Sequence, residues 1–414
     1  MRDQALSREH PNIIHPGWYA EYGYPHDTWT RMRREDPVSY WDETEGTPFW
    51  AVTKHADIVE VGGQPELFKS GQRIVLQHDG EPEEFGFPPT LIQLDPPKHG
   101  RYRQLVNRRF TPGVLKKMRD DIERIGAEIV DGLVKDSDTD ECDFVEKVAA
   151  PLPIAVIAWL MGVPREDWHL LFDWTNRAIA ATDPDFRTEG MTAQESSQAA
   201  MAELFAYFAE LVEDKKKNPG EDLVTLFANA EIDGEKLPDL DVLAWCMVIV
   251  IAGNETTRNA TSGGMLAFIE HPDQLRRLQA DLSLMPSAVE EVLRWTSPII
   301  HFSRTATADT ELGGKKIRQG ERLALFYPSA NRDEDLFDEP FEFRIDRTPN
   351  RHLAFGGGEH FCLGAHIARL ELQVAYRHLL PRIEEIELAG PVVRLQSNLV
   401  GGLKRLPIRY SLKP

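Results

Sequence analysis

The 414-residue chain has the composition of an ordinary globular protein, with 42% hydrophobic and 28% charged residues. Its formal net charge of −20 argues against binding to nucleic acid or to an anionic membrane surface, because either partner would repel the chain's mean field. Three widely spaced cysteines do not make a disulfide framework, and the N-terminus has no signal or transit-peptide pattern. These features predict a cytoplasmic protein.

The hydrophobic pattern predicts a mainly α-helical chain with small β-sheets at its edge. In chain order, we expect strands at 37–41 and 47–53, helices at 114–134, 166–182, 195–216, 239–270 and 286–296, and further strands at 311–327 and after Val392. No linker, low-complexity tract or repeat divides the sequence, so we expect one domain over residues 1–414 with a β-richer part over about 1–65. The apolar run 243–253 is too short to cross a bilayer and predicts a buried helix. Residues 328–362 form a long irregular segment, and such loops usually carry function.

A single cysteine, Cys362, follows three glycines and opens an apolar helix in the stretch HLAFGGGEHFCLGAHIARLEL. A phosphate-binding loop is excluded, because the stretch lacks the last glycine of the dinucleotide pattern and the Lys-Ser/Thr of a P-loop. A zinc site with His360 and His366 is disfavoured, because structural zinc sites usually recruit paired cysteines. An inert buried thiol is the usual interpretation of a lone cysteine. Here the helix N-terminus and the flexible glycines favour a thiolate, a soft metal ligand with an open approach.

These residues resemble the haem-thiolate signature FxxGxxxCxG of the cytochrome P450 family. The matching positions are Phe355, Gly356, Gly358, His360, Cys362, Gly364, Ala368 and Arg369. The resemblance implies the P450 fold, an α-rich triangular prism that holds haem b between a long central helix and the helix after the Cys loop. It also implies that Cys362 is the axial ligand of the iron, that Phe355 and Gly356 lie against the haem, and that His360 reaches a haem propionate.

A second motif, IAGNETTRNA, ends the apolar run and is similar to the family's oxygen-binding motif, (A/G)Gx(D/E)T(T/S). Burying Glu255 and Thr256 without partners would be costly, so by themselves these residues suit a proton pathway and a solvated helix end equally well. The resemblance implies that Thr256 steadies dioxygen and that Glu255 routes protons. Helical spacing places Val248, Ala252 and Thr256 on one face, where the small Ala252 leaves space above the iron.

A third segment, AVEEVLRW, holds Glu291 and Arg294 three residues apart, which alone indicates only a weak surface pair. Together with the other motifs it resembles the ExxR pair of the family, a structural lock behind the haem. The sequence departs from the pattern at Glu342, which stands where many relatives place the third, basic member of the lock. Arg344 and Arg347 are the candidate substitutes.

Two further segments resemble the family's propionate-binding elements, in which imidazole and guanidinium groups surround carboxylates. DPPKHGRYR resembles the HxxxR element and implicates His99 and Arg103. SRTA supplies Arg304 at the place of another propionate-binding arginine.

The substrate pocket is predicted by family analogy from weakly patterned, largely apolar segments. The candidate residues are Val248, Ala252, Ile299, Ile300, His301 and Val400. They indicate a hydrophobic substrate with His301 as a single polar contact, although core packing explains the same pattern equally well. The segments AGNETTRN and SNLVGGLKRLPIRY resemble the corresponding segments of bacterial family members that hydroxylate aliphatic chains of terpenoids, sterols or fatty acids.

The resemblance as a whole implies a monooxygenase that uses O2 and takes two electrons from a ferredoxin served by an NAD(P)H-dependent reductase. A haem-thiolate peroxygenase and a haem-based ligand sensor are the alternatives. Glu255 and Thr256 count against the peroxygenase, because peroxide does not require protonation of dioxygen.

The segment Lys98–Arg119 contains eight basic and no acidic residues. Its outward members are predicted to dock an acidic ferredoxin: Arg101, Arg108, Arg109, Lys116, Lys117 and Arg119.

Overall fold

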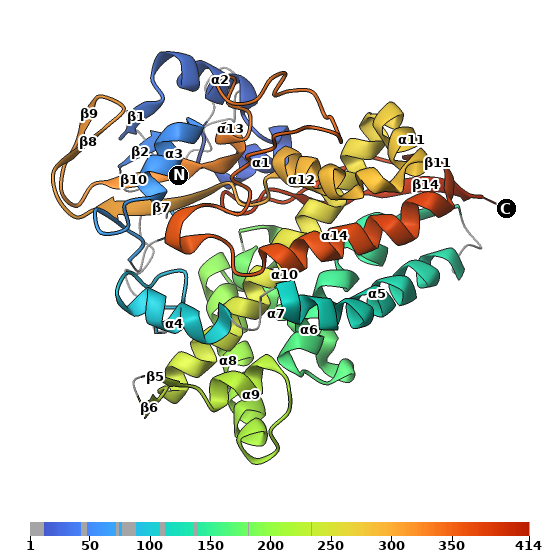
Figure 1. The fold of residues 1–414 in the computed structure, drawn as a ribbon, viewed down its shortest axis with the longest axis horizontal. Helices are drawn as coiled ribbons and strands as arrows, with labels where there is room; N and C mark the ends of the chain where they lie inside the picture. The colour runs from blue at the N-terminus through green and yellow to red at the C-terminus, as the bar shows by residue number, and fades with distance from the viewer. Residues whose placement is uncertain are drawn as a thin grey trace.

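The computed structural model describes residues 12–42, 48–71, 74–76, 88–107, 112–135, 140–180, 182–232 and 234–413. Helices form most of the molecule, and the largest sheet lies at one side of it (Figure 1). The α-helices are α1 (Pro16–Tyr22), α2 (His26–Glu35), α3 (His55–Gly62), α4 (Lys98–Asn107), α5 (Pro112–Lys135), α6 (Pro151–Met161), α7 (Trp168–Ile179), α8 (Ala193–Lys217), α9 (Leu223–Ala228), α10 (Asp239–Glu270), α11 (Pro272–Ala280), α12 (Met285–Thr296), α13 (Tyr327–Ala330) and α14 (Ala365–Leu379). The strands are β1 (Val38–Trp41), β2 (Phe49–Val52), β3 (Phe68–Lys69), β4 (Glu141–Asp143), β5 (Glu231–Ile232), β6 (Glu235–Lys236), β7 (His301–Ala306), β8 (Thr310–Leu312), β9 (Lys315–Ile317), β10 (Arg322–Phe326), β11 (Ile383–Leu388), β12 (Val393–Arg394), β13 (Leu403–Arg405) and β14 (Pro407–Leu412).

The 32-residue helix α10 runs through the middle of the helical part. Its first half is apolar on every side, and such a helix is stable only when it is enclosed. It contacts α6, α7, α8, α12 and α14. Among the described residues it is the one helix long and apolar enough to cross a bilayer by length and composition, but it is the central core helix of this fold. It ends at Glu270, and Pro272 then opens α11.

The largest sheet has the strand order β1-β2-β10-β7-β3. All its pairs are antiparallel except β2 with β10, which is parallel. Alternate residues of β10 enter different cores: Leu323 and Leu325 pack with β1 and α3, whereas Ala324 and Phe326 pack with α1 and α2. Both faces of β10 are therefore buried, and the sheet joins the start of the chain to its last third.

The predicted mainly α class with small peripheral sheets is confirmed. All five predicted helices form, and their ends differ from the predicted ones by at most three residues. Within the predicted strand segment 311–327, a Gly-Gly turn joins β8 to β9, with φ of 55° at Gly313 and 75° at Gly314. The region up to residue 65 contains β1 and β2, but also α1, α2 and α3. Residues 328–362 are largely irregular, apart from the end of α13 and the 3-10 turn η5 (Gly358–His360).

Candidate active site

The Cys loop joins the irregular segment to α14 and owes its shape to two glycines in the left-handed region. Gly356 has φ of 66° and Gly358 has φ of 64°. A Cβ on Gly358 would lie 1.9 Å from the carbonyl oxygen of Gly62 at the end of α3, so only glycine fits there. The backbone N–H of Cys362 donates to the Phe355 carbonyl at 2.9 Å, which folds the loop back on itself just before α14.

Cys362 is half-buried, and partial desolvation of its thiol raises its pKa. The N–H of Gly364 and the guanidinium groups of Arg103 and Arg369 act in the opposite direction. Desolvation is the larger effect, so the helix N-terminus alone does not make this thiol a thiolate. A bound metal cation would displace the proton, because a coordinating thiol is deprotonated by the metal charge.

In its mostly buried middle part, α10 has a short accessible strip. Ala252 is exposed, and Val248 and Thr256, one turn before and after it, are half-buried. Thr256 Oγ1 donates to the Ala252 carbonyl oxygen at 2.8 Å. The structure thus places the three residues on one face, as predicted, with a hydroxyl beside the smallest side chain of the strip.

Glu255 points away from this strip and is fully buried. Its carboxylate pairs with the guanidinium of Arg258, one turn further along α10, and accepts from Asn254 Nδ2 at 3.3 Å. Arg258 Nη1 in turn donates to Asn176 Oδ1 on α7 at 2.7 Å. Burial raises the pKa of Glu255, and the ion pair with Arg258 opposes that rise. The carboxyl is thus partnered, so the interpretation as a solvated helix end is wrong.

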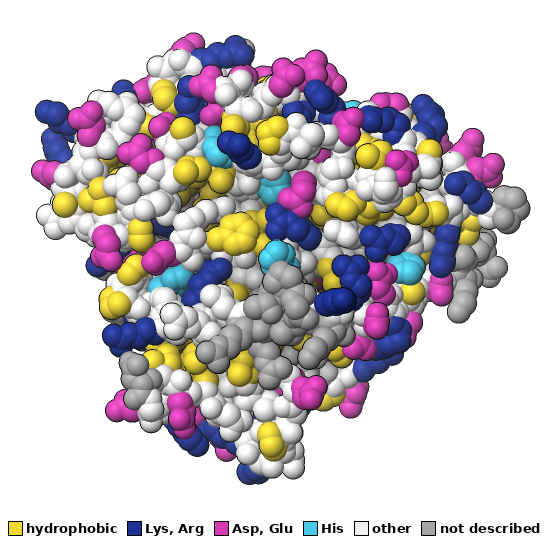
Figure 2. All heavy atoms as spheres, viewed as in Figure 1, with side chains coloured by type: hydrophobic (Ala, Val, Ile, Leu, Met, Phe, Trp, Pro, Cys, Tyr) yellow, Lys and Arg dark blue, Asp and Glu magenta, His cyan; other side chains and the backbone are white. Residues whose placement is uncertain are grey.

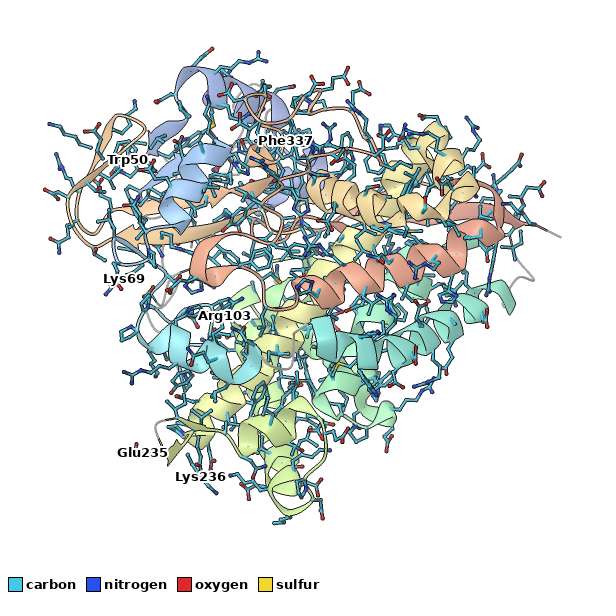
Figure 3. All side chains as sticks on the ribbon, in the orientation of Figure 1. Trp50, Lys69, Arg103, Glu235, Lys236 and Phe337 are labelled. Carbon is cyan, nitrogen blue, oxygen red and sulfur yellow. The ribbon has the colours of Figure 1, made fainter. Side chains whose placement is uncertain are left out.

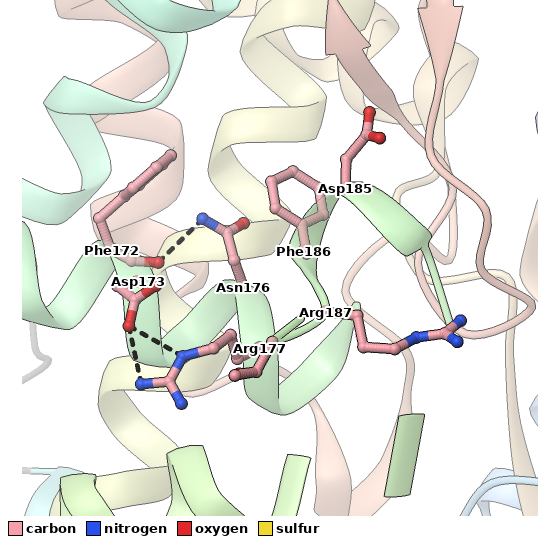
Figure 4. Close-up of a pocket in the computed structure, with 8 residues that line it drawn as sticks. Phe172, Asp173, Asn176, Arg177, Asp185, Phe186 and Arg187 are labelled. Atoms are coloured by element: carbon pink, nitrogen blue, oxygen red, sulfur yellow. Dashed lines mark hydrogen bonds and ion pairs between the residues drawn. The ribbon is translucent and has the colours of Figure 1, made fainter. Parts of the chain in front are cut away.

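A hollow of about 440 Å³ lies outside this ion pair, between α7 and the turn at 185–188. Figure 4 shows Asn176 and Phe172 of α7 facing Phe186 across it. The Cζ of Arg258 lies 5.9 Å from the ring centres of both phenylalanines. Asn176, which lines the hollow, is thus hydrogen-bonded to the buried Arg258.

Three of the predicted anion-binding side chains converge beside the Cys loop. The rings of His99 and His360 lie 4.4 Å apart between their centres, and His360 Nε2 is 3.0 Å from Ser70 Oγ. Burial first, and then the charges of Arg304, His99 and Arg103, lower the pKa of His360 to about 3. Arg304 on β7 is thus near enough to act on it. A region this rich in cationic and imidazole groups suits an acidic group.

His99 carries the clearest indication of a missing acidic partner. Its ring is 1% exposed, its Nε2 has no hydrogen-bond partner in the described structure, and its Nδ1 lies 3.5 Å from Glu359 Oε2, beyond good hydrogen-bond distance. Buried polar atoms are almost always satisfied in native proteins. The ring therefore fits an acceptor that arrives with a ligand.

Arg103, which is predicted to bind a propionate, contacts backbone carbonyls of the Cys loop. Its guanidinium donates to the carbonyl of Glu359 at 3.0 Å and to that of Phe361. Figure 3 shows Arg103 between α4 and the Cys loop. It therefore ties α4 to the backbone around Cys362.

Behind the loop, Glu291 and Arg294 form a fully buried ion pair on α12. Arg294 Nε and Nη2 donate to the two carboxylate oxygens at 2.8 and 2.7 Å. Arg347 adds a third charge, with its Nε 3.1 Å from Glu291 Oε2, whereas the Arg344 side chain pairs with Glu339 and only its backbone N–H reaches Glu291. Arg347 therefore takes the basic place that Glu342 leaves open.

The family model described as Cytochrome P450 matches residues 7–388 of this chain. The chain is a cytochrome P450. It is 37% identical over 416 residues to cytochrome P450-terp of Pseudomonas sp, with 96% of each chain covered. It is also 37% identical over 388 residues to a methyl-branched lipid omega-hydroxylase of Mycobacterium tuberculosis, covering 92% of this chain and 90% of the relative. A solved Mycobacterium marinum cytochrome P450 in complex with pseudoionone is 34% identical, with a TM-score of 0.89 over 96% of this chain and 97% of the other.

The predicted P450 fold is therefore confirmed, and so is the monooxygenase over the peroxygenase and the sensor. The cofactor of this P450 is haem b. The residues present fit this cofactor. Cys362 follows a loop with two glycines of positive φ, Ala252 puts a small side chain on the accessible face of α10, and the buried imidazole of His99 lacks a hydrogen-bond acceptor.

Two of the predicted substrate contacts are wrong. Ile300 is fully buried in the cluster that joins the N-terminal helices to the sheet. His301 is also fully buried. Both ring nitrogens are engaged with backbone groups: Nε2 accepts from the Leu76 N–H at 3.2 Å, and Nδ1 lies 3.0 Å from the Asn398 carbonyl. Burial lowers the pKa of His301 to about 4, so the ring is neutral and its nitrogens are used by the backbone.

Ile299 and Val400 form an isolated β-bridge next to the end of α7. Val400 is 1% exposed and Ile299 is half-buried. Because successive residues of extended backbone face opposite ways, the side chain of Ile299 points to the side opposite to that of Ile300. Of this pair, Ile299 keeps the more accessible side chain.

Sequence reasoning missed two sets of residues in this P450. Asn176 and Arg258 surround Glu255, and the signal for Arg258 was its i, i+3 spacing from an acid. Glu290 binds Arg369 and His352, which lie on α14 and before the Cys loop. Both histidine and arginine belong to the quoted Cys-loop stretch, but nothing in their order identifies the acid that joins them.

Proposed function

We propose that this P450 inserts one oxygen atom of O2 into a C–H bond of a hydrophobic small molecule, with Cys362 as the axial haem ligand. When bound, the haem supplies thiolate-supported activation of oxygen. Two observations support the proposal: the Cys loop opens α14, which packs against α10, and α10 has an accessible strip that bears the Thr256 hydroxyl. We infer that the chain acts as one catalytic domain, over residues 1–414, in the cytoplasm.

Phe355 and Gly356 are proposed to line the haem on the side of Cys362. His99, His360 and Arg304 would hold its propionates, since they bring imidazole and guanidinium donors to one place. Arg103 would act through the loop carbonyls that it binds. Glu291, Arg294 and Arg347 would keep α12 fixed behind the site.

Thr256 is proposed to take part in proton transfer through its hydroxyl oxygen. Its hydroxyl hydrogen is committed to the Ala252 carbonyl, so its oxygen offers lone pairs toward the accessible side. It can therefore accept a hydrogen bond from an O–H group on that side. Glu255 is proposed as the adjacent proton source, because its buried carboxyl has a raised pKa and takes up a proton more readily than an exposed one.

The substrate is proposed to be an aliphatic chain of a terpenoid, sterol or fatty acid, packed near Val248, Ala252 and Ile299. The apolar strip supports this class, as do the printed names of a methyl-branched lipid omega-hydroxylase, a linalool 8-monooxygenase and a steroid C26-monooxygenase among the relatives. Titration of the purified protein with representatives of each class should shift the haem Soret band toward the substrate-bound form. Compounds without an aliphatic chain should not shift it.

Substitution of Thr256 by alanine should uncouple the reaction. The protein should fold and consume NAD(P)H, but the product formed per reducing equivalent should fall by about tenfold or more, because a positioned proton-handling group is lost. Peroxide assay and product analysis measure this partition. Thr256→Ser keeps the hydroxyl and should restore most of the coupling; equal coupling in Thr256→Ala and wild type would rule out the proposed role.

An acidic ferredoxin is the proposed electron donor, docking on the Cys-loop side. α5 packs against α14, which places exposed Lys116 and Arg119 on this side. Arg108 and Arg109, and the side chain of Lys117, lie outside the described residues. Figure 2 views this face, where Lys and Arg side chains gather over α14 and α5. The surface is thus complementary in sign to an acidic partner although the whole chain is acidic.

Charge reversal at this surface should slow reduction by ferredoxin. Lys116→Glu and Arg119→Glu should lower the rate several-fold at low salt, and rising salt should slow the wild type, since charges are screened over about 8–10 Å. Stopped-flow reduction measures the rates. Lys217→Glu, at the end of α8, is the matched control and should behave as wild type. If the reduction rate changes neither with salt nor with these charge reversals, the docking site lies elsewhere.

A further inference from the structure

One acidic side chain outside the predicted site connects α12, α14 and the segment that leads into the Cys loop. Glu290 receives two hydrogen bonds from Arg369 of α14, from Nε to Oε1 at 2.6 Å and from Nη2 to Oε2 at 2.8 Å. Its Oε2 also lies 3.1 Å from Nε2 of His352. This two-pronged geometry fixes the guanidinium plane and is stronger than a single contact.

The pair reaches Cys362 through Phe355. The Cζ of Arg369 lies 4.5 Å from the centre of the Phe355 ring, and the carbonyl of Phe355 accepts the N–H of Cys362 at 2.9 Å. His352 Nδ1 accepts the Ala354 N–H at 3.2 Å, so the same acid steadies the backbone before Phe355. Arg369 therefore contacts the residue whose backbone carbonyl accepts the N–H of the proposed haem ligand.

Glu290 and Arg369 form an ion pair in a region that solvent screens only in part. Their side chains are 28% and 26% exposed. Burial alone would raise the pKa of Glu290, but the hydrogen bonds from Arg369 and His352 outweigh it and lower the pKa to about 2. Replacing either residue with glutamine therefore removes a full unit of charge beside the loop.

We propose that Glu290 is a positioning residue that sets the reduction potential of the haem by holding Arg369 against Phe355 and neutralising its charge near Cys362. The inference rests on the proposed role of Cys362 as the axial ligand. Reduction adds one electron to the site, so an uncompensated cation favours the reduced state and an uncompensated anion disfavours it. Glu290 thereby gives the loop a fixed guanidinium without a net positive charge.

Opposite shifts in two charge-neutralising variants test this proposal. Glu290→Gln should make the midpoint potential more positive, and Arg369→Gln should make it more negative, each changing the reduction equilibrium constant by about three- to tenfold. The double variant should return close to the wild type. Spectroelectrochemical titration of the purified haem protein, without ferredoxin, measures the potentials and separates this effect from partner docking.

A second acid–arginine pair on the same helix gives the matched control. Glu123 binds Arg377, eight residues after Arg369, with Nη1 and Oε1 3.1 Å apart. Eight residues of helix place Arg377 about 12 Å further from the Cys loop along α14 than Arg369. Glu123→Gln should therefore leave the potential unchanged. Arg369→Lys keeps the charge and should stay near the wild-type potential, whatever happens to the fork geometry.

The outcomes separate this inference from the haem-ligand assignment. If all variants keep the red-shifted carbonyl band but their potentials do not move, or all move in one direction, Glu290 has only a structural role. If Glu290→Gln fails to retain haem, the comparison of Arg369→Gln with Arg369→Lys still decides, because equal potentials in these two would reject the charge argument. A wild-type protein that lacks the red-shifted band would instead reject Cys362 as the ligand.

Discussion

Replacing Cys362 by serine is expected to abolish the strongly red-shifted Soret band of the reduced carbonyl complex and to reduce monooxygenase turnover to background. The band requires a sulfur donor opposite the carbon monoxide, and a serine oxygen is a poorer electron donor to the iron. The loop itself should survive, because the hydrogen bond from residue 362 to Phe355 uses the backbone N–H. Optical difference spectroscopy of the reduced protein with and without carbon monoxide measures the loss.

The other two cysteines provide the controls. Cys142 lies on the short strand β4, and Cys246 is fully buried in α10. Burial raises the pKa of both thiols, and neither residue follows a glycine loop. Cys142→Ser should keep the band unchanged. A normal band in Cys362→Ser, or its loss in Cys142→Ser, would show that the haem ligand has been assigned to the wrong residue.

Removing the carboxylate of Glu291 should cost about 3–5 kcal/mol of unfolding free energy and most of the bound haem. The carboxylate is fully buried and accepts from Arg294, Arg347, the backbone N–H of Arg344 and Asn350. Glu291→Ala leaves two buried guanidinium groups without their counter-charge, which is the costly half of breaking a buried ion pair. Denaturant unfolding and the haem-to-protein absorbance ratio measure the two effects.

The same carboxylate makes stability depend on acid. Burial alone would raise the pKa of Glu291, but the hydrogen bonds and charges of Arg294, Arg344 and Arg347 outweigh it and hold the pKa below its usual value. Its stabilisation is therefore fully present above the unfolded-state pKa of roughly 4.3 and is lost as pH falls through the depressed folded value. Glu291→Gln should lack this part of the acid dependence.

The exposed pair of Glu339 and Arg344 is the matched control for the lock. Its atoms lie 2.9 Å apart and its side chains are 60% and 39% exposed. Solvent screens such a pair, so Glu339→Gln should change the unfolding free energy by less than about 1 kcal/mol. If Glu291→Ala were as mild as Glu339→Gln, the buried charges would have another source of compensation.

The elements that were predictable are those whose signal is local. Helical periodicity located α10 and α12 to within one residue, because their apolar patterns are long and their ends are marked by proline or polar residues. The Cys loop was predictable because glycine, cysteine and helix start lie within a few residues of one another. The strip of Val248, Ala252 and Thr256 followed from spacing alone.

The errors concern residues whose partners lie far away in sequence. His301 looked like a polar contact in an apolar segment, but its ring bonds are to Leu76 and Asn398, 225 and 97 residues away. Arg344 and Arg347 were indistinguishable as substitutes for the lock, since they share chemistry and sit three residues apart. The turn in which the Arg347 N–H donates to the Arg344 carbonyl at 3.1 Å determines which guanidinium enters the interior.

The parallel pairing of β2 with β10 has a consequence for synthesis of the protein on the ribosome. Trp50 in β2 donates to Glu321, just before β10, at 2.8 Å across 271 residues of sequence. At a synthesis rate of roughly 5–20 residues per second, β10 is completed about 15–55 seconds after β2, and until then the edge of β2 that pairs with β10 has no partner. During that time the hairpin of β1 and β2 exposes apolar side chains and unpaired backbone groups. The edge of β2 that pairs with β10 therefore stays unpaired until residues 322–326 have been synthesised.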